Sequence, residues 1–247
     1  MSFLPTAAPA RLHTRRPIVT GTSVLGLKYQ GGVLVASDTL LSYGSMAKTQ
    51  DASRIAIIDD HTVVAASGEY SDFQALEKLL KAKALEERTS LLDDLYEDSN
   101  KLSNAESTWN YLRMVMYQRR NKMNPYWNDV LIAGCGKQED TAFLGLVDKI
   151  GTTYTDNFVA TGFGSYLALP ILREHYRDDL TEGEARALLE DCLRVLFYRD
   201  CRASAQIQLA KFENGKCILS EPYQLETSWD APSFVQPVAN LEGDGGW

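Results

Sequence analysis

A glycine–threonine junction near the start of the chain, Gly21–Thr22, is the first pair of residues whose types could do chemistry. Cleavage after Gly21 would expose Thr22 at a new N-terminus, where its hydroxyl could act as a nucleophile. The same threonine precedes a β-rich run that ends at Asp38, and β-branched residues are common in strands. The residues alone favour a structural role for Thr22 and leave the nucleophile open as the alternative.

The cysteines and histidines do not indicate a metal site. No two cysteines have the C-x-x-C spacing and the histidines lie apart from them, so we expect no structural zinc, no other metal and no cofactor. We expect reduced thiols, and we expect Cys192, within an apolar helical run, to lie in the core. These residues are Cys135, Cys192, Cys201, Cys217, His13, His61 and His175.

The composition indicates a chain of 247 residues that can bury a sizeable core, since 45% of its residues are hydrophobic. Its net charge of −8 argues against a general nucleic-acid binder, whose affinity depends on neutralising phosphates. No apolar run is long enough to span a bilayer, and residues 1–19 lack the apolar stretch of a secretory signal. We therefore expect one domain with neither nucleic-acid nor membrane partners.

The elements that must position the junction begin as strands and then change to helices. Alternating β-formers separated by turn residues predict four short strands. They are expected at residues 22–28, 33–37, 54–59 and 62–68, with hairpin turns at 31–32 and 60–61. Apolar residues at helical spacing then predict helices at 71–88, capped by Ser71, and at 107–122. The acidic stretch between these helices is expected to be a loop.

Strands and then helices return in the second half of the chain. Strands are expected at 128–135, 141–148 and 151–157, helices at 165–178 and 181–200, and a closing hairpin at 205–220. Thr181 and Glu184 fit a capping box, and Asn214–Gly215 fits a hairpin turn. Strands separated by helix pairs predict an α+β fold, a four-layer αββα sandwich in which two antiparallel sheets face each other between outer helices.

Several long motifs make this chain similar to a known family. They are GTSVLGLKYQGGVLVASD, SYGSMAK, ASGEYSDFQ, YQRRNKMNPYWN, ATGFGSYLA and VLFYRDCRAS, spread over residues 14–230. The chain resembles the β-type subunits of the 20S proteasome, within the N-terminal nucleophile hydrolase superfamily, and among them a non-catalytic subunit at the seventh position of the β ring. The resemblance implies the αββα fold and a place in a barrel of stacked α and β rings. Such barrels degrade ubiquitin-tagged proteins in the cytoplasm and nucleus.

Active members of this family use an N-terminal threonine that is released after a glycine and whose own α-amine handles the proton. By resemblance, Thr22 falls on the nucleophile position, and Asp38 and Asp200 fall on two aspartates that orient the site. Gly68 falls on the glycine whose backbone N–H stabilises the oxyanion. These correspondences would support the alternative interpretation, an active N-terminal threonine hydrolase that uses Thr22 after cleavage at Gly21.

Three other positions contradict an enzyme. By resemblance, Arg54 falls where active members have a lysine, and Ala203 and Phe163 fall where they have serines. Arginine stays protonated and cannot exchange a proton with the threonine, and alanine and phenylalanine offer no hydroxyl. Because catalytic groups that act as a unit also fail as a unit, the resemblance favours a degenerate site in which Arg54 is salt-bridged.

The two aspartates also have structural interpretations. Asp38, after a strand, suits a turn or hydrogen-bonding residue. Asp200 suits a buried ion pair with Arg199 at the end of a helix. Neither interpretation requires a reaction at Thr22.

The sequence therefore predicts a non-catalytic structural subunit of the β ring. Its implied partners are the other α and β subunits of a 28-subunit barrel, together with assembly chaperones. We expect a propeptide-like arm at 1–13, a β-type domain at 14–228, and a tail at 229–247 that docks on neighbouring subunits. By resemblance, we expect an active neighbouring subunit to cut the chain between His13 and Thr14 and so to remove the arm.

Overall fold

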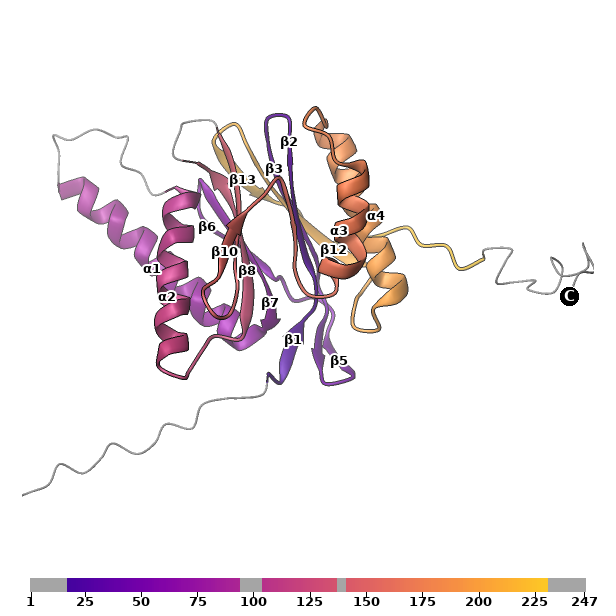
Figure 1. Cartoon of the computed structure of the whole chain (residues 1–247), viewed down its shortest axis with the longest axis horizontal. Coiled ribbons are helices and arrows are strands. Elements are labelled where there is room, and N and C mark those ends of the chain that lie inside the picture. Colours follow the sequence, from indigo (N-terminus) through magenta and orange to yellow (C-terminus); the bar gives the residue numbers. More distant parts are fainter. Residues whose placement is uncertain (1–16, 94–103, 137–140, 231–247) are drawn as a thin grey trace, which may run out of the picture.

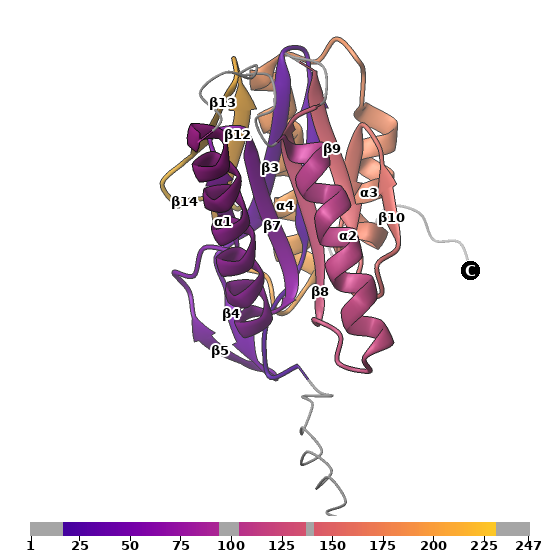
Figure 2. The same ribbon diagram turned by 90° about the vertical axis from the view of Figure 1, so that its left-hand side faces the viewer.

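Two antiparallel sheets face each other, and a pair of helices covers the outer side of each sheet (Figures 1 and 2). The structure is a computed structural model that describes residues 17–93, 104–136 and 141–230. The predicted α+β fold, a four-layer αββα sandwich, is confirmed.

The first sheet has eight strands, in the order β10-β9-β8-β7-β1-β4-β5 with β6 also paired to β7. The strands are β1 (Val19–Gly21), β4 (Leu41–Tyr43), β5 (Met46–Thr49), β6 (Ile55–Asp59), β7 (Thr62–Glu69), β8 (Asn128–Cys135), β9 (Ala142–Val147) and β10 (Thr153–Thr155). Helices α1 (Tyr70–Asp93) and α2 (Ala105–Asn121) cover its outer face (Figure 2). Strand β1 lies between β7 and β4, so it joins the β4–β5 hairpin to the rest of the sheet.

The second sheet has six strands, in the order β11-β2-β3-β12-β13 with β14 also paired to β12. The strands are β2 (Val24–Tyr29), β3 (Gly32–Asp38), β11 (Phe158–Ala160), β12 (Gln206–Glu213), β13 (Lys216–Leu219) and β14 (Tyr223–Gln224). Helices α3 (Gly164–His175) and α4 (Glu182–Arg199) pack on its outer face (Figure 1). Every residue of β3 is buried, because this central strand is covered on both faces.

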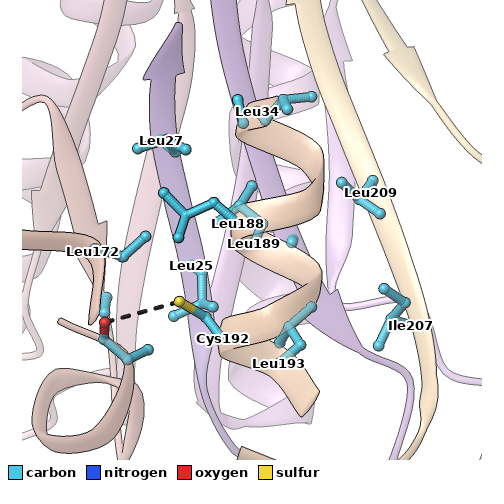
Figure 3. Packing of buried hydrophobic residues seen from close by; sticks show 14 of the residues in the cluster. Leu25, Leu27, Leu34, Leu172, Leu188, Leu189, Cys192, Leu193, Ile207 and Leu209 are labelled. Carbon is cyan, nitrogen blue, oxygen red and sulfur yellow. Dashed lines mark hydrogen bonds between the residues drawn. The ribbon is translucent and has the colours of Figure 1, made fainter. Parts of the chain in front are cut away.

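Three hydrophobic layers hold the sandwich together, because each strand turns successive side chains to opposite faces. Between the sheets, Val33 and Val35 of β3 pack with residues of β8 that include Leu131 and Ala133. Figure 3 shows the layer between α4 and the second sheet, where Cys192 lies among leucines. Burial raises the pKa of this thiol to about 12, and the predicted core position of Cys192 is confirmed.

Local sequence explains where several elements begin and turn. Thr181 and Glu184 form the predicted capping box at the start of α4, each side chain bonding to the other residue's backbone N–H. Asn214 and Gly215 have positive φ angles of 50° and 76°, which suit a two-residue turn between antiparallel strands. The turn expected at 31–32 lies one residue earlier, because Gly32 already pairs in β3 and Gly31 takes the positive φ.

Other predicted boundaries also differ from the structure. The strand expected from residue 22 begins at Val24, because residues 22 and 23 connect β1 to β2. The helix expected at 71–88 runs from Tyr70 to Asp93, so Ser71 lies in its first turn rather than at its cap. Part of the expected acidic loop is therefore helical. None of the helices in the described ranges is long and apolar enough to cross a membrane.

Candidate functional site

The Gly21–Thr22 junction lies where the chain leaves β1, in the first sheet, and enters β2, in the second sheet. Thr22 and Ser23 make this crossing without strand pairing of their own. A cleft of about 250 Å³ opens beside the junction. Of the site positions expected from the sequence, Thr22, Gly68 and Phe163 line this cleft. The structure therefore brings part of the expected constellation to one surface, whereas Asp38, Arg54, Asp200 and Ala203 do not line this cleft.

Arg54 lies behind the junction, with 1% of its surface exposed. Its Nε donates to the carbonyl oxygen of Asp38 at 3.2 Å, and its Nη1 donates to the carbonyl oxygens of Thr22 and Ala66 at 3.1 and 3.4 Å. Its Nη2 donates to the carbonyl oxygen of Ser23 at 3.0 Å and to the carboxylate of Asp38. These five bonds match the five N–H donors of a guanidinium. The predicted salt bridge of Arg54 is confirmed.

Asp38 ends β3 and is 3% exposed. One carboxylate oxygen pairs with Arg54, and the other accepts the backbone N–H of Ser204 at 2.9 Å. Burial raises the pKa of Asp38, and the Arg54 charge and the Ser204 N–H oppose this rise. The aspartate therefore neutralises a buried guanidinium and ties the end of β3 to the segment before β12.

Two glycines let β1 pass through this crowded region. A Cβ atom on Gly21 would lie 2.2 Å from the Cδ atom of Arg54. Its ladder partner Gly68 has a φ of +97°, and a Cβ atom there would lie 2.0 Å from the carbonyl oxygen of Trp127. Packing against Arg54 is thus sufficient to explain a glycine before Thr22, whether or not the chain is cleaved there.

Asp200 and Ala203 lie at the end of α4. Asp200 is the C-cap and is 6% exposed, and its Oδ1 atom accepts the N–H of Arg202 at 2.9 Å. Arg199 is exposed, and within the described part of the chain the Oδ2 atom of Asp200 has no hydrogen-bond partner. The predicted ion pair of Asp200 with Arg199 is therefore wrong. Arg199 is the last residue of α4 and is exposed, whereas Asp200 caps the helix and is buried, so the two side chains lie in different environments. Ala203 donates its N–H to the carbonyl oxygen of Asp200 at 3.1 Å.

The wall of the cleft includes residues that the sequence interpretation missed. The Lys149 ammonium lies 5.0 Å from the ring centre of Trp127, and both residues line the cleft beside the half-exposed Phe163. Asp129 also lines it; burial raises the pKa of Asp129, and the N–H and charge of Lys149 oppose this rise. Trp127 and Asp129 flank the start of β8, and Lys149 follows β9. Polar and aromatic residues at the ends of predicted strands could therefore have indicated this wall of the cleft.

Glu69 is a buried residue that the sequence interpretation also missed. It is 6% exposed, at the last position of β7. Its carboxylate accepts the backbone N–H of Ile18 and, at 3.2 Å, that of Val19, and it accepts the hydroxyl of Ser71 at 3.0 Å. Glu69 therefore anchors the chain at the point where it enters β1.

The arrangement around Thr22 holds the chain in place at the crossing between the two sheets. Arg54 binds the carbonyl oxygen of Thr22 and, as a permanently charged donor, cannot accept a proton from its hydroxyl.

The four-layer sandwich, with Thr22 and Gly68 beside a cleft at the crossing between the sheets, has the architecture of the N-terminal nucleophile hydrolase fold. Comparison with known proteins narrows this class. The proteasome subunit family matches residues 18–212, and the chain belongs to this family.

Individual relatives agree along most of their length. The chain is 42% identical over 231 residues, which cover 94% of it and 90% of the relative, to proteasome subunit beta type-4 of Arabidopsis thaliana. It is 44% identical over 217 residues, 87% of it and 80% of the relative, to the beta type-4 subunit of Dictyostelium discoideum. It is 38% identical over 230 residues, 90% of it and 85% of the relative, to proteasome subunit beta type-7 of Saccharomyces cerevisiae. The predicted resemblance to proteasome β-type subunits is confirmed, and beta type-4 is the name of the individual subunit that the sequence motifs most resemble.

Several predictions fall outside the described residues. They concern the arm at 1–13, processing between His13 and Thr14, and the tail beyond residue 230. These remain predictions.

Proposed function

We propose that this chain is a non-catalytic structural subunit of the β ring of the 20S proteasome. The observation that carries the proposal is Arg54, whose buried guanidinium binds the backbone of Thr22 and Ser23 where an active site would need a proton acceptor. Phe163, which lines the same cleft as Thr22, adds no hydroxyl there, and Ala203 has none to offer. The role left to such a chain is to complete the ring and to position active neighbours.

We also propose which partners this chain binds and in which cellular compartments it acts. The named relatives are proteasome β subunits, which supports assembly with other α and β subunits in a 28-subunit barrel, aided by chaperones. Each subunit of a hetero-oligomeric ring must present distinct surfaces to its neighbours. The particle would degrade ubiquitinated proteins in the cytoplasm and nucleus, and cell fractionation followed by detection of this chain in assembled particles measures both compartments.

A covalent threonine-directed probe tests the absence of catalysis. Particles carrying the tagged chain are treated with the probe, and labelling of this chain is read by mass spectrometry. We expect active neighbours to be labelled and this chain to remain unlabelled. The Thr22→Ala variant should assemble and hydrolyse peptides like the parent, as should the control Thr155→Ala, an exposed change on β10. Labelling of this chain that disappears only in Thr22→Ala would establish an active threonine hydrolase.

Maturation by a neighbour is part of the proposal. We propose that the mature chain begins at Thr14 after removal of residues 1–13. N-terminal sequencing of this subunit from assembled particles measures the start. A start at Thr22 would instead indicate self-cleavage after Gly21 and would support the enzyme.

We also propose that residues 229–247 dock on neighbouring subunits. The start of this tail is held on α4: the Trp229 ring packs edge-on against Tyr198 with ring centres 4.9 Å apart, and the Tyr198 hydroxyl accepts the N–H of Ser228 at 2.8 Å. A tail that leaves from a fixed point has less conformational freedom to lose on docking. Deleting residues 231–247 should lower the yield of complete particles on native gels, whereas normal yield would contradict docking.

A further inference from the structure

We propose that the cleft beside Thr22 binds the C-terminal end of a short peptide without forming a covalent bond. The peptide carboxylate is held by Lys149 and Arg202, and the last side chain of the peptide, apolar or aromatic, packs against Trp127 and Phe163. This ligand rests on the proposed function, because a subunit of a protein-degrading particle meets the peptides that its active neighbours release. It gives a role to a cleft whose threonine lacks a proton acceptor.

Two cations in the lining of the cleft favour an acidic ligand. Lys149 and Arg202 both line it, and neither forms a salt bridge with another residue that the structure describes. The carboxylate among the described lining residues is that of Asp129, so two positive charges and one negative charge leave a net charge of +1 there. A bound carboxylate would neutralise this charge and accept charge-assisted hydrogen bonds, which are stronger than neutral ones.

The aromatic wall of the cleft is in place before a ligand arrives. The backbone N–H of Trp127 donates to the carboxylate of Asp72 at 2.9 Å, and its carbonyl oxygen accepts the N–H of Glu69 at 3.0 Å. The Lys149 ammonium lies 5.0 Å from the Trp127 ring centre, so a cation and an apolar surface adjoin each other. Phe163 lines the same cleft and is 52% exposed. A carboxylate next to an apolar side chain matches this wall, and a preformed site loses less free energy to ordering.

Asn128 adds an acceptor that needs a donor. It lines the cleft and is 2% exposed, and its Nδ2 donates to the carbonyl oxygens of Ser67 and Glu69 at 3.0 and 2.9 Å. Its Oδ1 has no hydrogen-bond partner in the part of the chain that the structure describes. A buried acceptor without a partner is costly, so a ligand N–H that reaches it, directly or through one water, would stabilise the complex. This favours a peptide over a carboxylic acid that has no amide.

The size of the cleft favours a chain end over an internal segment. Its volume is about 250 Å³, whereas pockets for drug-sized ligands span about 300–1,000 Å³. One or two residues of a peptide fit such a volume. An internal residue offers no main-chain carboxylate to Lys149 and Arg202, so the last residue of a peptide is the better match.

A pair of photoreactive peptides tests the proposal on assembled particles. The active threonines are first blocked with the covalent threonine-directed probe. Acetylglycyl-photoleucine is then added either with its free carboxylate or as the carboxamide, and mass spectrometry locates the crosslinks. We expect the acid to label this chain at the residues that line the cleft about tenfold more than the amide does, because only the acid can form charge-assisted bonds. Equal labelling by both peptides, or no labelling of the cleft, would overturn the proposal, including the case in which residues 14–16 of the chain itself fill the cleft.

A charge variant identifies the groups that hold the carboxylate. In Lys149→Met combined with Arg202→Met, labelling by the acid should fall to the level of the amide. The control Lys216→Met, at an exposed lysine on β13, should label like the parent. Acid-specific labelling that survives in the double variant would refute the assignment of these two cations, and the comparison of acid with amide in the parent needs no variant to assemble. Labelling of Thr22 by the threonine-directed probe in the same digest bears only on the proposed absence of catalysis, so the two failures are distinguishable.

Discussion

Replacement of Arg54 by methionine should destabilise the protein strongly, because it removes one half of a buried ion pair. Methionine has a similar length and keeps the apolar stem, so the change mainly deletes the guanidinium. Asp38 would remain buried at 3% exposure with one bond, from the N–H of Ser204. The carbonyl oxygens of Thr22 and Ser23 would also lose their donor.

The expected magnitude follows from these losses. Breaking a buried pair by removing one partner costs about 3–5 kcal/mol, because an uncompensated charge stays in the interior. Carbonyl oxygens that lose their partner add to the cost unless water reaches them. We therefore expect the free energy of unfolding to fall by about 4 kcal/mol, a large share of the stability of an ordinary domain. The control Arg173→Met, on the exposed side of α3, should change it by less than about 0.5 kcal/mol.

The effect of pH supplies a second signature of the same mechanism. Burial raises the pKa of Asp38 and Arg54 opposes this rise, so the pKa should climb further in Arg54→Met. A carboxyl whose pKa is higher in the folded than in the unfolded state loses stability as pH rises through the folded pKa. The destabilisation should therefore be larger at pH 8 than at pH 5. The double variant Arg54→Met with Asp38→Asn should recover part of the loss, because it removes the unpaired charge.

Urea unfolding of the purified chain, followed by tryptophan fluorescence, measures these free energies, and the fraction of each variant incorporated into particles gives an independent reading. A loss below about 1 kcal/mol for Arg54→Met, with no dependence on pH, would refute the reasoning. It would mean that water or a local shift replaces the guanidinium at little cost.

Three further predictions concern packing and thiol reactivity. Gly21→Ala should cost about 1–3 kcal/mol through its clash with Arg54, and the loss should shrink in combination with Arg54→Ala; additive urea-unfolding energies would contradict the clash. Gly68→Ala should cost about 3 kcal/mol, because it adds a side chain at a φ of +97° and against a backbone carbonyl; unfolding and particle incorporation check this, and near-parental values would contradict it. Iodoacetamide at pH 7.5 should modify the exposed Cys201 at least a hundredfold faster than Cys217, whose pKa burial raises to about 12, and mass spectrometry showing equal rates would contradict the structure.

Much of the fold could be predicted because its signals are local. The capping box at Thr181 and the turn at Asn214–Gly215 each depend on residues within a few positions of one another. Strand β1 has no such signal, since its partners on β7 lie about fifty positions further along the chain. The same holds for β11, which pairs with β2 across more than a hundred residues. Short strands that exist only through distant pairing are invisible to periodicity.

The candidate site also has features that residue types predict and features that only the fold reveals. Residue types alone showed that Arg54 cannot act as a base and that the side chain of Ala203 offers no hydroxyl, because these are properties of single side chains. They could not show that the Asp200 carboxylate binds the N–H of Arg202 instead of pairing with Arg199. They also could not show that Glu69 binds the start of β1. Both arrangements depend on where helices end and where strands meet. The resemblance supplied the positions, and the structure shows which of them face the cleft.

The identity of residue 54 links the lost chemistry to the architecture. A lysine offers three donors from a single nitrogen, whereas Arg54 spreads five bonds over the ends of two sheets. Those bonds join β3, the crossing at Thr22 and the strand that carries Ala66. The guanidinium that cannot serve as a proton acceptor is therefore the same group that fixes the Gly21–Thr22 junction between the sheets. In this chain, structural support of the β1–β2 crossing and catalysis at Thr22 make opposite demands on one side chain, and the observed bonds favour support.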